Sequence, residues 1–335
     1  TGFTGSAGMA VVLADSAALF VDGRYTAQVR DQASSELFQF LHLIEQPPAP
    51  WLCEQLCERL GAEAGATVAC DPRLHSMAWY RDTARALGEA GVELVADADN
   101  LVDRCWEDPP APVVEEALLL GREFTGETGT DKRGRMAAQL RTQRCDAALV
   151  FAPDAVSWLL NVRGRDMPQL PVLASSALLR ADGGLQLFVD PRRLPDGFGA
   201  HAGPGVEVHD AADVPAVLGQ YRDKRVLACP ASASAWWHLA LEDAGARVVP
   251  GEDPVALAKA CKNPVELDGT RAAHRRDAVA ETEFLAWLDA EVAAGRLHDE
   301  AVLSDKLLSL RAAQKHFHAC SFDTISAAGG NAAMA

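Results

Sequence analysis

The sequence predicts an α/β fold made of two similar units and a third, different one. Each similar unit carries a β-hairpin pattern, in which an apolar run, a short polar turn and a second apolar run follow one another. These stretches read AVVLADSAALFVDGR from residue 10 and ALLRADGGLQLFVDPR from residue 177. Further on, VACDPRLHSMAWY aligns with LACPASASAWWHL, and EAGVELV with DAGARVV. A proline cluster, EDPPAPVVEE, separates the two repeats.

The composition suits a globular protein with several domains. The chain has 335 residues, and 49% of them are apolar, which is more than one compact core requires. Its formal net charge is −16, which repels phosphate backbones and anionic membrane surfaces, so neither nucleic acid nor a membrane is an expected partner. The eight cysteines are scattered without a C-x-x-C pair, which favours a reducing cytoplasm.

The repeated units have the predicted order strand, strand, helix, strand, helix, strand. Three helices are expected, at residues 51–61, 74–90 and 232–244. Alternation of strands and helices indicates mixed sheets covered by helices. We therefore expect one domain at residues 1–107, a linker at 108–116, a second domain at 117–258 and the start of a third at 262–335.

The third unit begins with a strong helix signal. Asn263 is placed as N-cap, Pro264 at the first helical position and Glu266 at the capping-box position. Apolar residues at helical spacing extend this helix to about Ala294, and a second helix is expected at 300–314. FHACSFDTIS then predicts a strand. Two helices and one strand cannot close a core, so we expect the remainder of this unit to lie outside the sequence.

Two stretches could carry a ligand. The glycine-rich TGFTGSAG matches neither the phosphate-loop patterns nor the nucleophile elbow, so a structural turn is the preferred interpretation. His316, His318 and Cys320 would share one face of the predicted strand, a spacing that could coordinate zinc. Because no fourth ligand lies nearby in sequence, a strand with one solvated side is preferred.

An Asp-x-Arg motif follows the hairpin in both repeats. Asp22 with Arg24 and Asp190 with Arg192 occupy matching positions, which indicates that the aspartates serve a turn or a strand end. One of the arginines could have been recruited to contact an anion or a peptide. No stretch assembles a nucleophile, a base and an oxyanion donor, so we assign no catalytic residue within the chain.

Four stretches carry a resemblance to a known family. They are GFTGSAGMAVV, SWLLNVRGRDMPQLPV, KACKNPVELDGTRAAHRRDAVAETEFLAWLDAEV and SFDTISAAGGNAAMA. In this order they closely resemble the three-domain Xaa-Pro aminopeptidases, the aminopeptidase P group of the pita-bread metallopeptidases. The resemblance implies two creatinase-like N-terminal α/β domains with mixed sheets, followed by the beginning of a pita-bread α+β catalytic domain. It thereby accounts for the repeat.

The resemblance also implies where the catalytic centre lies. In the family, SFDTIS leads into a catalytic histidine, and two aspartates, a histidine and two glutamates further on hold two divalent metal ions, usually manganese. These residues are expected beyond Ala335, so we assign no metal ligand to the chain. The family's opening residues, ahead of GFTG, are expected to be missing as well. In the family, a glycine commonly follows soon after this serine and a proline precedes the asparagine. SAAGGN departs from that pattern.

The implied activity is hydrolysis of the bond between an N-terminal residue and a following proline, with the activity belonging to the full-length parent. Arg24 matches a family arginine near the substrate and is a candidate substrate contact. A homodimer is implied too. The alternative function is that of a binding protein: a non-catalytic pita-bread-related module that binds peptides or proteins. A related prolidase or creatinase is disfavoured, because those usually carry one such N-terminal domain.

Overall fold

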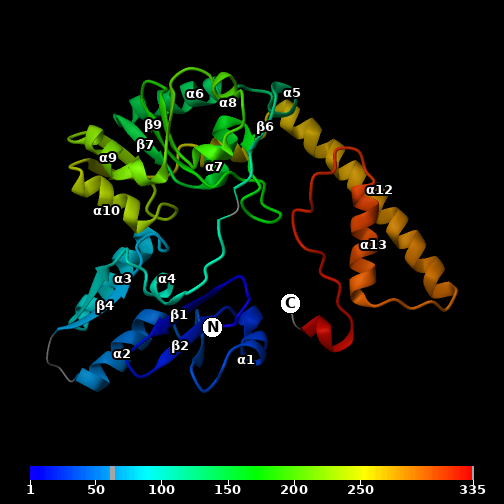
Figure 1. Ribbon diagram of the computed structural model, residues 1–335, viewed down its shortest axis with the longest axis horizontal. Coiled ribbons are helices and arrows are strands. Elements are labelled where there is room, and N and C mark those ends of the chain that lie inside the picture. The colour runs from blue at the N-terminus through cyan, green and yellow to red at the C-terminus, as the bar shows by residue number, and fades with distance from the viewer. Residues whose placement is uncertain (61–64, 113, 334–335) are drawn as a thin grey trace.

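The computed structural model describes residues 1–60, 65–112 and 114–333, and the predicted α/β class is confirmed. Figure 1 shows an N-terminal unit in blue and cyan, a central unit in green, and a C-terminal unit of two long helices and an extended segment in gold to red. Within the described ranges, no helix is both long enough and apolar enough to cross a bilayer.

The N-terminal unit contains two separate sheets. Its elements are β1 (Gly8–Val12), β2 (Ala17–Val21), η1 (Gly23–Tyr25), α1 (Gln28–Gln32), β3 (Gln39–His42), α2 (Pro48–Leu60), β4 (Ala66–Cys70), α3 (Met77–Glu89), β5 (Val92–Ala96) and α4 (Leu101–Cys105). β1 pairs antiparallel with β2, which pairs parallel with β3. β4 and β5 form a parallel pair of their own. Trp51 of α2 and Leu87 of α3 pack with Phe20 of β2 in one hydrophobic cluster.

The central unit is built on one six-stranded sheet. Its elements are β6 (Leu118–Leu119), α5 (Arg122–Thr125), α6 (Gly129–Thr142), β7 (Ala147–Val150), α7 (Pro153–Leu160), β8 (Val162–Arg163), β9 (Ser176–Arg180), β10 (Leu185–Phe188), η2 (Pro191–Arg193), α8 (Phe198–Ala202), β11 (Val206–His209), η3 (Ala211–Asp213), α9 (Val214–Leu218), η4 (Gly219–Tyr221), β12 (Arg225–Ala228), α10 (Ala235–Asp243), β13 (Arg247–Pro250) and α11 (Ala256–Ala260). The strand order is β11-β10-β9-β7-β12-β13.

Helices cover both faces of the central sheet. Met136 and Leu140 of α6 and Leu159 of α7 belong to the cluster on one face. Val217 of α9 and Trp237 of α10 belong to the cluster on the other. β7, in the middle of the sheet, is buried along its whole length. A strand covered on both faces reads as a continuous apolar run, and AALV of β7 does so.

The predicted hairpins and helices are confirmed, with additions. β1 with β2 and β9 with β10 form the two hairpins, and α2, α3 and α10 lie where helices were expected. Residue 61, at the end of the first predicted helix, lies outside the described residues. The predicted order missed β3 and β11, because QFLH and VEVH have only four residues each, too few to establish a period. It also missed β7, since four apolar residues do not distinguish a strand from a helix.

The two repeats contact each other through matching segments. Ser76 and Ser234, the N-caps of α3 and α10, form an isolated antiparallel bridge. Met77 donates its backbone N–H to the Ala233 oxygen at 3.1 Å, and Ala235 donates to the His75 oxygen at 2.8 Å. When the two repeats are aligned on these N-caps, Val68 matches Val226, whereas the sequence alignment matches Val68 with Leu227.

The C-terminal unit consists of α12 (Pro264–Ala293), α13 (Glu300–Ala312) and a segment ending in η5 (Gly329–Ala333). Asn263 and Glu266 form the predicted capping box at the start of α12. The two helices pack side by side, yet Leu285 and Val292 on α12 remain more than half exposed. The apolar stripe predicted for α12 therefore lies largely uncovered by the described residues.

The strand predicted at FHACSFDTIS is wrong. Residues 317–326 contain no strand; they have a bend at 321–322, and the Asp323 side chain accepts a hydrogen bond from Gln169. A strand is stable only beside a hydrogen-bonded neighbour, and among the described residues none lies beside this segment. Apolar alternation predicts the tendency to extend but cannot supply the neighbour.

Candidate functional site

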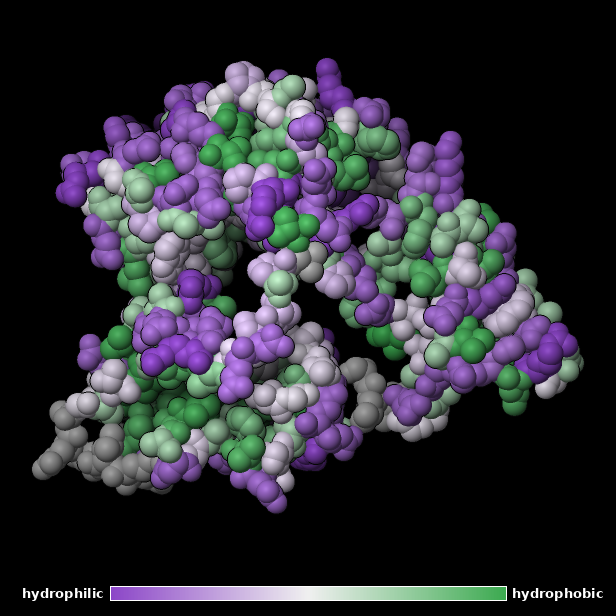
Figure 2. All heavy atoms as spheres, viewed as in Figure 1, coloured by the Kyte–Doolittle hydropathy of each residue, from purple (hydrophilic) through white to green (hydrophobic). Residues whose placement is uncertain are grey.

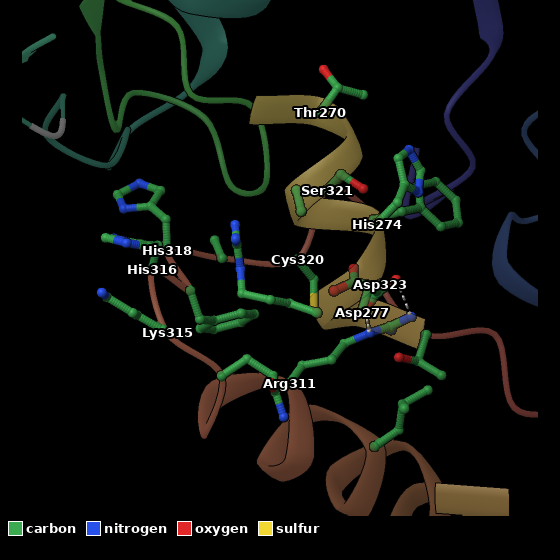
Figure 3. A pocket seen from close by; sticks show the side chains of 18 residues that line it. Thr270, His274, Asp277, Arg311, Lys315, His316, His318, Cys320, Ser321 and Asp323 are labelled. Atoms are coloured by element: carbon green, nitrogen blue, oxygen red, sulfur yellow. Dashed lines mark hydrogen bonds and ion pairs between the residues drawn. The ribbon is translucent and has the colours of Figure 1, made fainter. Parts of the chain in front are cut away.

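A cavity of about 730 Å³ lies between α12, α13 and the segment at 314–324. Figure 3 shows His274 and Asp277 on α12, Arg311 on α13, and His318 with Cys320 on the segment that closes the cavity. The segment is tied to the central unit, because Gln169 donates its amide N–H to Asp323 at 2.6 Å. The cavity is therefore built by α12, α13 and the segment at 314–324.

The charged wall of the cavity is an ion-pair network. Arg311 donates from Nε to Asp277 at 2.7 Å and from Nη2 to Glu281 at 3.0 Å, and its side chain is 21% exposed. The hydrogen bond to Asp277 raises the pKa of Arg311. Because both carboxylates are engaged by this guanidinium, the network joins α12 to α13.

His316, His318 and Cys320 do not line up as one face of a strand. Figure 3 shows the two histidine rings beside each other, away from the Arg311 network. His316 has a positive φ of 65°, which interrupts an extended backbone. Among the described residues, no three His, Cys, Asp or Glu side chains are placed to hold a metal ion. The described side chains thus do not fit a dinuclear centre, and we derive no reaction step through one.

Arg24 lies in η1, directly after β2, on a locally fixed turn. The Asp22 carboxylate accepts from the Arg24 backbone N–H at 2.9 Å and from its Nε at 2.9 Å. The same Arg24 side chain holds the pKa of Asp22 below its ordinary value. The guanidinium lies 5.1 Å from the ring centroid of Tyr25, whose hydroxyl is 2.6 Å from the Ser6 hydroxyl. Arg24 remains 60% exposed and faces solvent in a defined orientation.

Among the residues that the structure describes, the Asp-x-Arg turn occurs at three places. Arg192 repeats the arrangement on Asp190, with Nε at 3.0 Å and a side chain that is 74% exposed. Arg73 repeats it on Asp71 and also donates to the Ala98 oxygen at 2.6 Å. The aspartates therefore cap turns, as predicted. The third copy was missed, although DPR in VACDPRLHS was visible in the sequence.

A buried lysine that the sequence did not single out connects the central unit to α12. Lys132 on α6 is 1% exposed, and its Nζ donates to the Trp158 oxygen at 2.9 Å and to the Asn161 side-chain oxygen at 2.7 Å. Burial lowers its pKa to about 8. Trp158 in turn donates from Nε1 to Glu266 in the capping box of α12 at 3.2 Å. Such a shifted group can mark an active site, but these partners give it a positioning role.

Two matches to domain families cover most of the chain. Both carry the description Creatinase/Prolidase N-terminal domain, and they span residues 1–105 and 108–266.

Curated relatives match over the whole length of the chain. Two named Probable Xaa-Pro aminopeptidase P are 34% identical, from Coccidioides posadasii (strain RMSCC 757 / Silveira), and 35% identical, from Botryotinia fuckeliana (strain B05.10). Each match covers 100% of this chain, with 56% of the first relative and 52% of the second. The chain thus spans about half the length of these relatives.

A solved structure shows the same arrangement. It is the X-prolyl aminopeptidase from Caenorhabditis elegans, described as a cytosolic enzyme with a di-nuclear active site. The likeness has a TM-score of 0.88 and 32% sequence identity, and it covers 97% of this chain and 53% of that one. With its two matched domains in tandem, the chain belongs to the creatinase/prolidase family.

Proposed function

We propose that this chain is part of a metallo-aminopeptidase that releases the N-terminal residue from peptides with proline in the second position. The observation that supports it is the likeness to the C. elegans X-prolyl aminopeptidase, at a TM-score of 0.88 over 97% of the chain. A likeness over all three units is more specific than one over a single N-terminal domain. The activity belongs to the full-length parent, which would hold two divalent metal ions, with manganese as the proposed metal.

The remaining features of the parent follow the same reasoning. We propose domains at 1–107 and 117–258, a linker at 108–116 and a catalytic domain that starts at 262. The parent is proposed to be a cytoplasmic homodimer. The cytosolic description of the C. elegans enzyme and the acidic net charge of −16 support the compartment and the absence of nucleic-acid partners.

The activity is tested on the parent protein. Purified parent is stripped with a chelator, supplied with Mn²⁺, and assayed for release of the first residue from an Xaa-Pro peptide and from a matched Xaa-Ala peptide. Release from the Xaa-Pro peptide alone, dependent on Mn²⁺, is the expected result. A parent that binds the Xaa-Pro peptide without cleaving it under either condition would favour the non-catalytic alternative and overturn the proposal.

Arg24 is the proposed substrate contact in this chain. Asp22 holds the edge of its guanidinium that carries Nε and Nη2, so the side chain loses little conformational freedom when it binds a ligand. Its Nη1 makes no hydrogen bond to a described residue and remains available to a carbonyl or carboxylate oxygen of a peptide. Arginine suits such an oxygen because its fork of N–H donors is planar and always charged.

Arg192 provides a matched control, because it lies in the same type of turn and is similarly exposed. In the parent, Arg24→Ala should lower kcat/KM for the Xaa-Pro peptide by about 10- to 100-fold, the loss expected for one charge-assisted hydrogen bond. Arg192→Ala should change it less than about twofold. Equal effects of the two substitutions would show that the turn matters and that Arg24 does not contact the substrate.

A further inference from the structure

The two side chains that start α12 each use one polar atom within the helix. Asn263 Oδ1 accepts from the Glu266 N–H at 3.0 Å, and Glu266 Oε2 accepts from the Asn263 N–H at 2.9 Å. These two bonds complete the capping box. The second polar atom of each side chain therefore remains for a contact outside the helix.

Both of these second atoms contact the central unit. Glu266 Oε1 accepts from Trp158 Nε1 on α7 at 3.2 Å. Asn263 Nδ2 donates to the Thr125 backbone oxygen, at the end of α5, at 2.8 Å. Trp158 is only 7% exposed and Thr125 only 5%, so both partners are buried. The capping box thus starts α12 and at the same time attaches it to α5 and α7.

The two partners of the capping box belong to one network inside the central unit. Lys132 donates to the Trp158 oxygen and to the Asn161 side-chain oxygen, as described above. Asn161 Nδ2 donates to the Glu127 oxygen at 2.8 Å, and Thr125 Oγ1 donates to the same oxygen at 3.1 Å. The indole and the carbonyl that the capping box contacts are therefore held in place relative to each other.

Charge and close packing favour the same attachment. Burial lowers the pKa of Lys132 and of Arg163, and the negative charge of Glu266 opposes both shifts. A carboxylate at this point therefore faces two partly desolvated cations. Gly126, which ends α5 with a φ of 71°, lies directly beside the capping box, because a Cβ there would be 2.6 Å from Asn263 Oδ1. Glycine permits both this conformation and this close approach.

The helix is long compared with its attachment. The 30 residues of α12 span about 45 Å, so a tilt of about 5° at the first turn displaces the far end by about 4 Å. Figure 1 shows α12 beginning beside α5 and running away from the central unit. Figure 2 shows an opening between the C-terminal unit, at the right, and the rest of the molecule. Small changes at the first turn therefore become large displacements of this unit.

We propose that Asn263, Glu266 and Trp158 are positioning residues that fix the direction of α12 and thereby place the C-terminal unit relative to Arg24. This inference rests on the proposed function, in which Arg24 contacts the peptide that the catalytic domain cleaves. Backbone hydrogen bonds between the two repeats already join the N-terminal unit to the central unit. The first turn of α12 then decides where the catalytic domain lies with respect to both.

A distance measurement on the parent tests the attachment without reference to peptidase activity. Spin-labelled unnatural amino acids replace Lys224, exposed in the central unit, and Leu297, which is 85% exposed just after α12. Labelled parent is diluted with excess unlabelled parent, so that distances within one chain dominate. The wild type should give one narrow distribution. Trp158→Phe keeps an aromatic ring and removes the Nε1 donor, and it should broaden or shift the distribution by about 4 Å.

A second variant guards against a folding defect at the buried Trp158. Glu266→Gln keeps the shape of the side chain but replaces one acceptor oxygen with an amide group that only donates, so one of the two N–H groups loses its acceptor. It should broaden the same distribution. Glu283→Gln, at an exposed position of the same helix, is the control and should leave the distribution unchanged. Wild-type distributions in both Trp158→Phe and Glu266→Gln would overturn the proposal.

Kinetics separate positioning from a general effect on folding. In the parent, Trp158→Phe should lower kcat/KM for the Xaa-Pro peptide roughly 10- to 100-fold, the loss expected for a misplacement of about an ångström or more. Glu283→Gln should change it less than about twofold. Arg24→Ala should then cost less than about threefold in the Trp158→Phe parent, because a misplaced Arg24 has little substrate contact left to lose.

The outcomes distinguish the attachment from the proposed function. If Arg24→Ala lowers kcat/KM by the same factor with and without Trp158→Phe, then α12 and Arg24 act independently and the positioning role is wrong. A parent that cleaves no Xaa-Pro peptide in any form would refute the proposed function. The distance measurement would still decide whether the capping box fixes the direction of α12.

Discussion

Lys132→Met tests whether the buried lysine holds the central unit together. Methionine keeps the length of the side chain and removes the ammonium group. Trp158 keeps a hydrogen bond on its carbonyl oxygen, because the Asn161 N–H also donates to it at 3.3 Å. The Asn161 side-chain oxygen, in contrast, loses the Lys132 donor at 2.7 Å. The substitution also removes the contact of the Lys132 ammonium group with the Trp158 ring, whose centroid lies 4.0 Å away.

The expected magnitude combines three contributions. An orphaned buried acceptor costs about 1–3 kcal/mol, and the lost cation–π contact about 1–2 kcal/mol. Removing a buried charge offsets part of this, because burial lowers the pKa of Lys132 from 10.5 to about 8, which corresponds to roughly 3 kcal/mol against the charged form. These contributions sum to a net change at pH 7 between a gain of about 1 kcal/mol and a loss of about 2 kcal/mol, so the pH dependence is the discriminating readout.

The pH dependence has a definite sign. Between pH 8 and pH 10.5 the unfolded chain holds the Lys132 proton while the folded chain has released it, so the wild type gains stability as the pH rises through this window. The variant lacks this gain, so its stability relative to wild type should fall by up to about 3 kcal/mol across this window. Unfolding in urea, followed by tryptophan fluorescence at pH 7 and pH 10, measures it.

Lys224→Met serves as the control, because Lys224 is exposed and lies in the same unit. It should unfold within about 0.5 kcal/mol of wild type at pH 7. If the stability of Lys132→Met relative to wild type is the same at both pH values, then the buried Lys132 does not titrate at a lowered pKa in the folded chain.

Three further changes have expected outcomes. Gly164→Ala would place Cβ 2.2 Å from a backbone oxygen and should lower Tm by several degrees, whereas Gly134→Ala meets no atom within 4 Å and should not lower it. Asp71→Asn should abolish a loss of stability below pH 4, because Arg73 lowers the pKa of Asp71 to about 2, and urea midpoints from pH 2 to 6 measure this. Burial lowers the pKa of His238, so wild-type stability should fall as the pH drops below 6.5, and His238→Leu should flatten that dependence in thermal melts at pH 5 and 7.5.

The parts of the fold that the sequence predicts are those with local causes. Asn263, Pro264 and Glu266 start α12 through contacts within four residues, so the sequence alone places that helix. The hairpin of β1 and β2 is equally local. β7 is not, because its four residues become a strand only between β9 and β12, which follow it along the chain by 29 residues or more. The failed strand at 317–326 has the same explanation.

The candidate site shows the same division between local and distant causes. The turn that holds Arg24 follows from Asp22 two residues earlier, and the repeat predicts it. Lys132 could not be found this way, because a lysine in the sequence GTDKRGRM is typical of a solvated helix face. Its burial depends on Asn161, which takes a left-handed φ of 56° at the end of α7 and turns its side chain back toward α6.

Because the same turn holds Arg24 and Arg192, the turn cannot account for a role that Arg24 alone has. Asp22 and Asp190 hold their arginines with nearly the same bond lengths, so any property that the turn confers is shared by Arg24 and Arg192. What differs is the surroundings: Tyr25 follows Arg24, whereas another arginine follows Arg192. A role specific to Arg24 must therefore arise from its neighbours and from whatever faces that side of the N-terminal unit. For this reason the comparison of the two alanine variants separates recognition from folding, which neither variant could do alone.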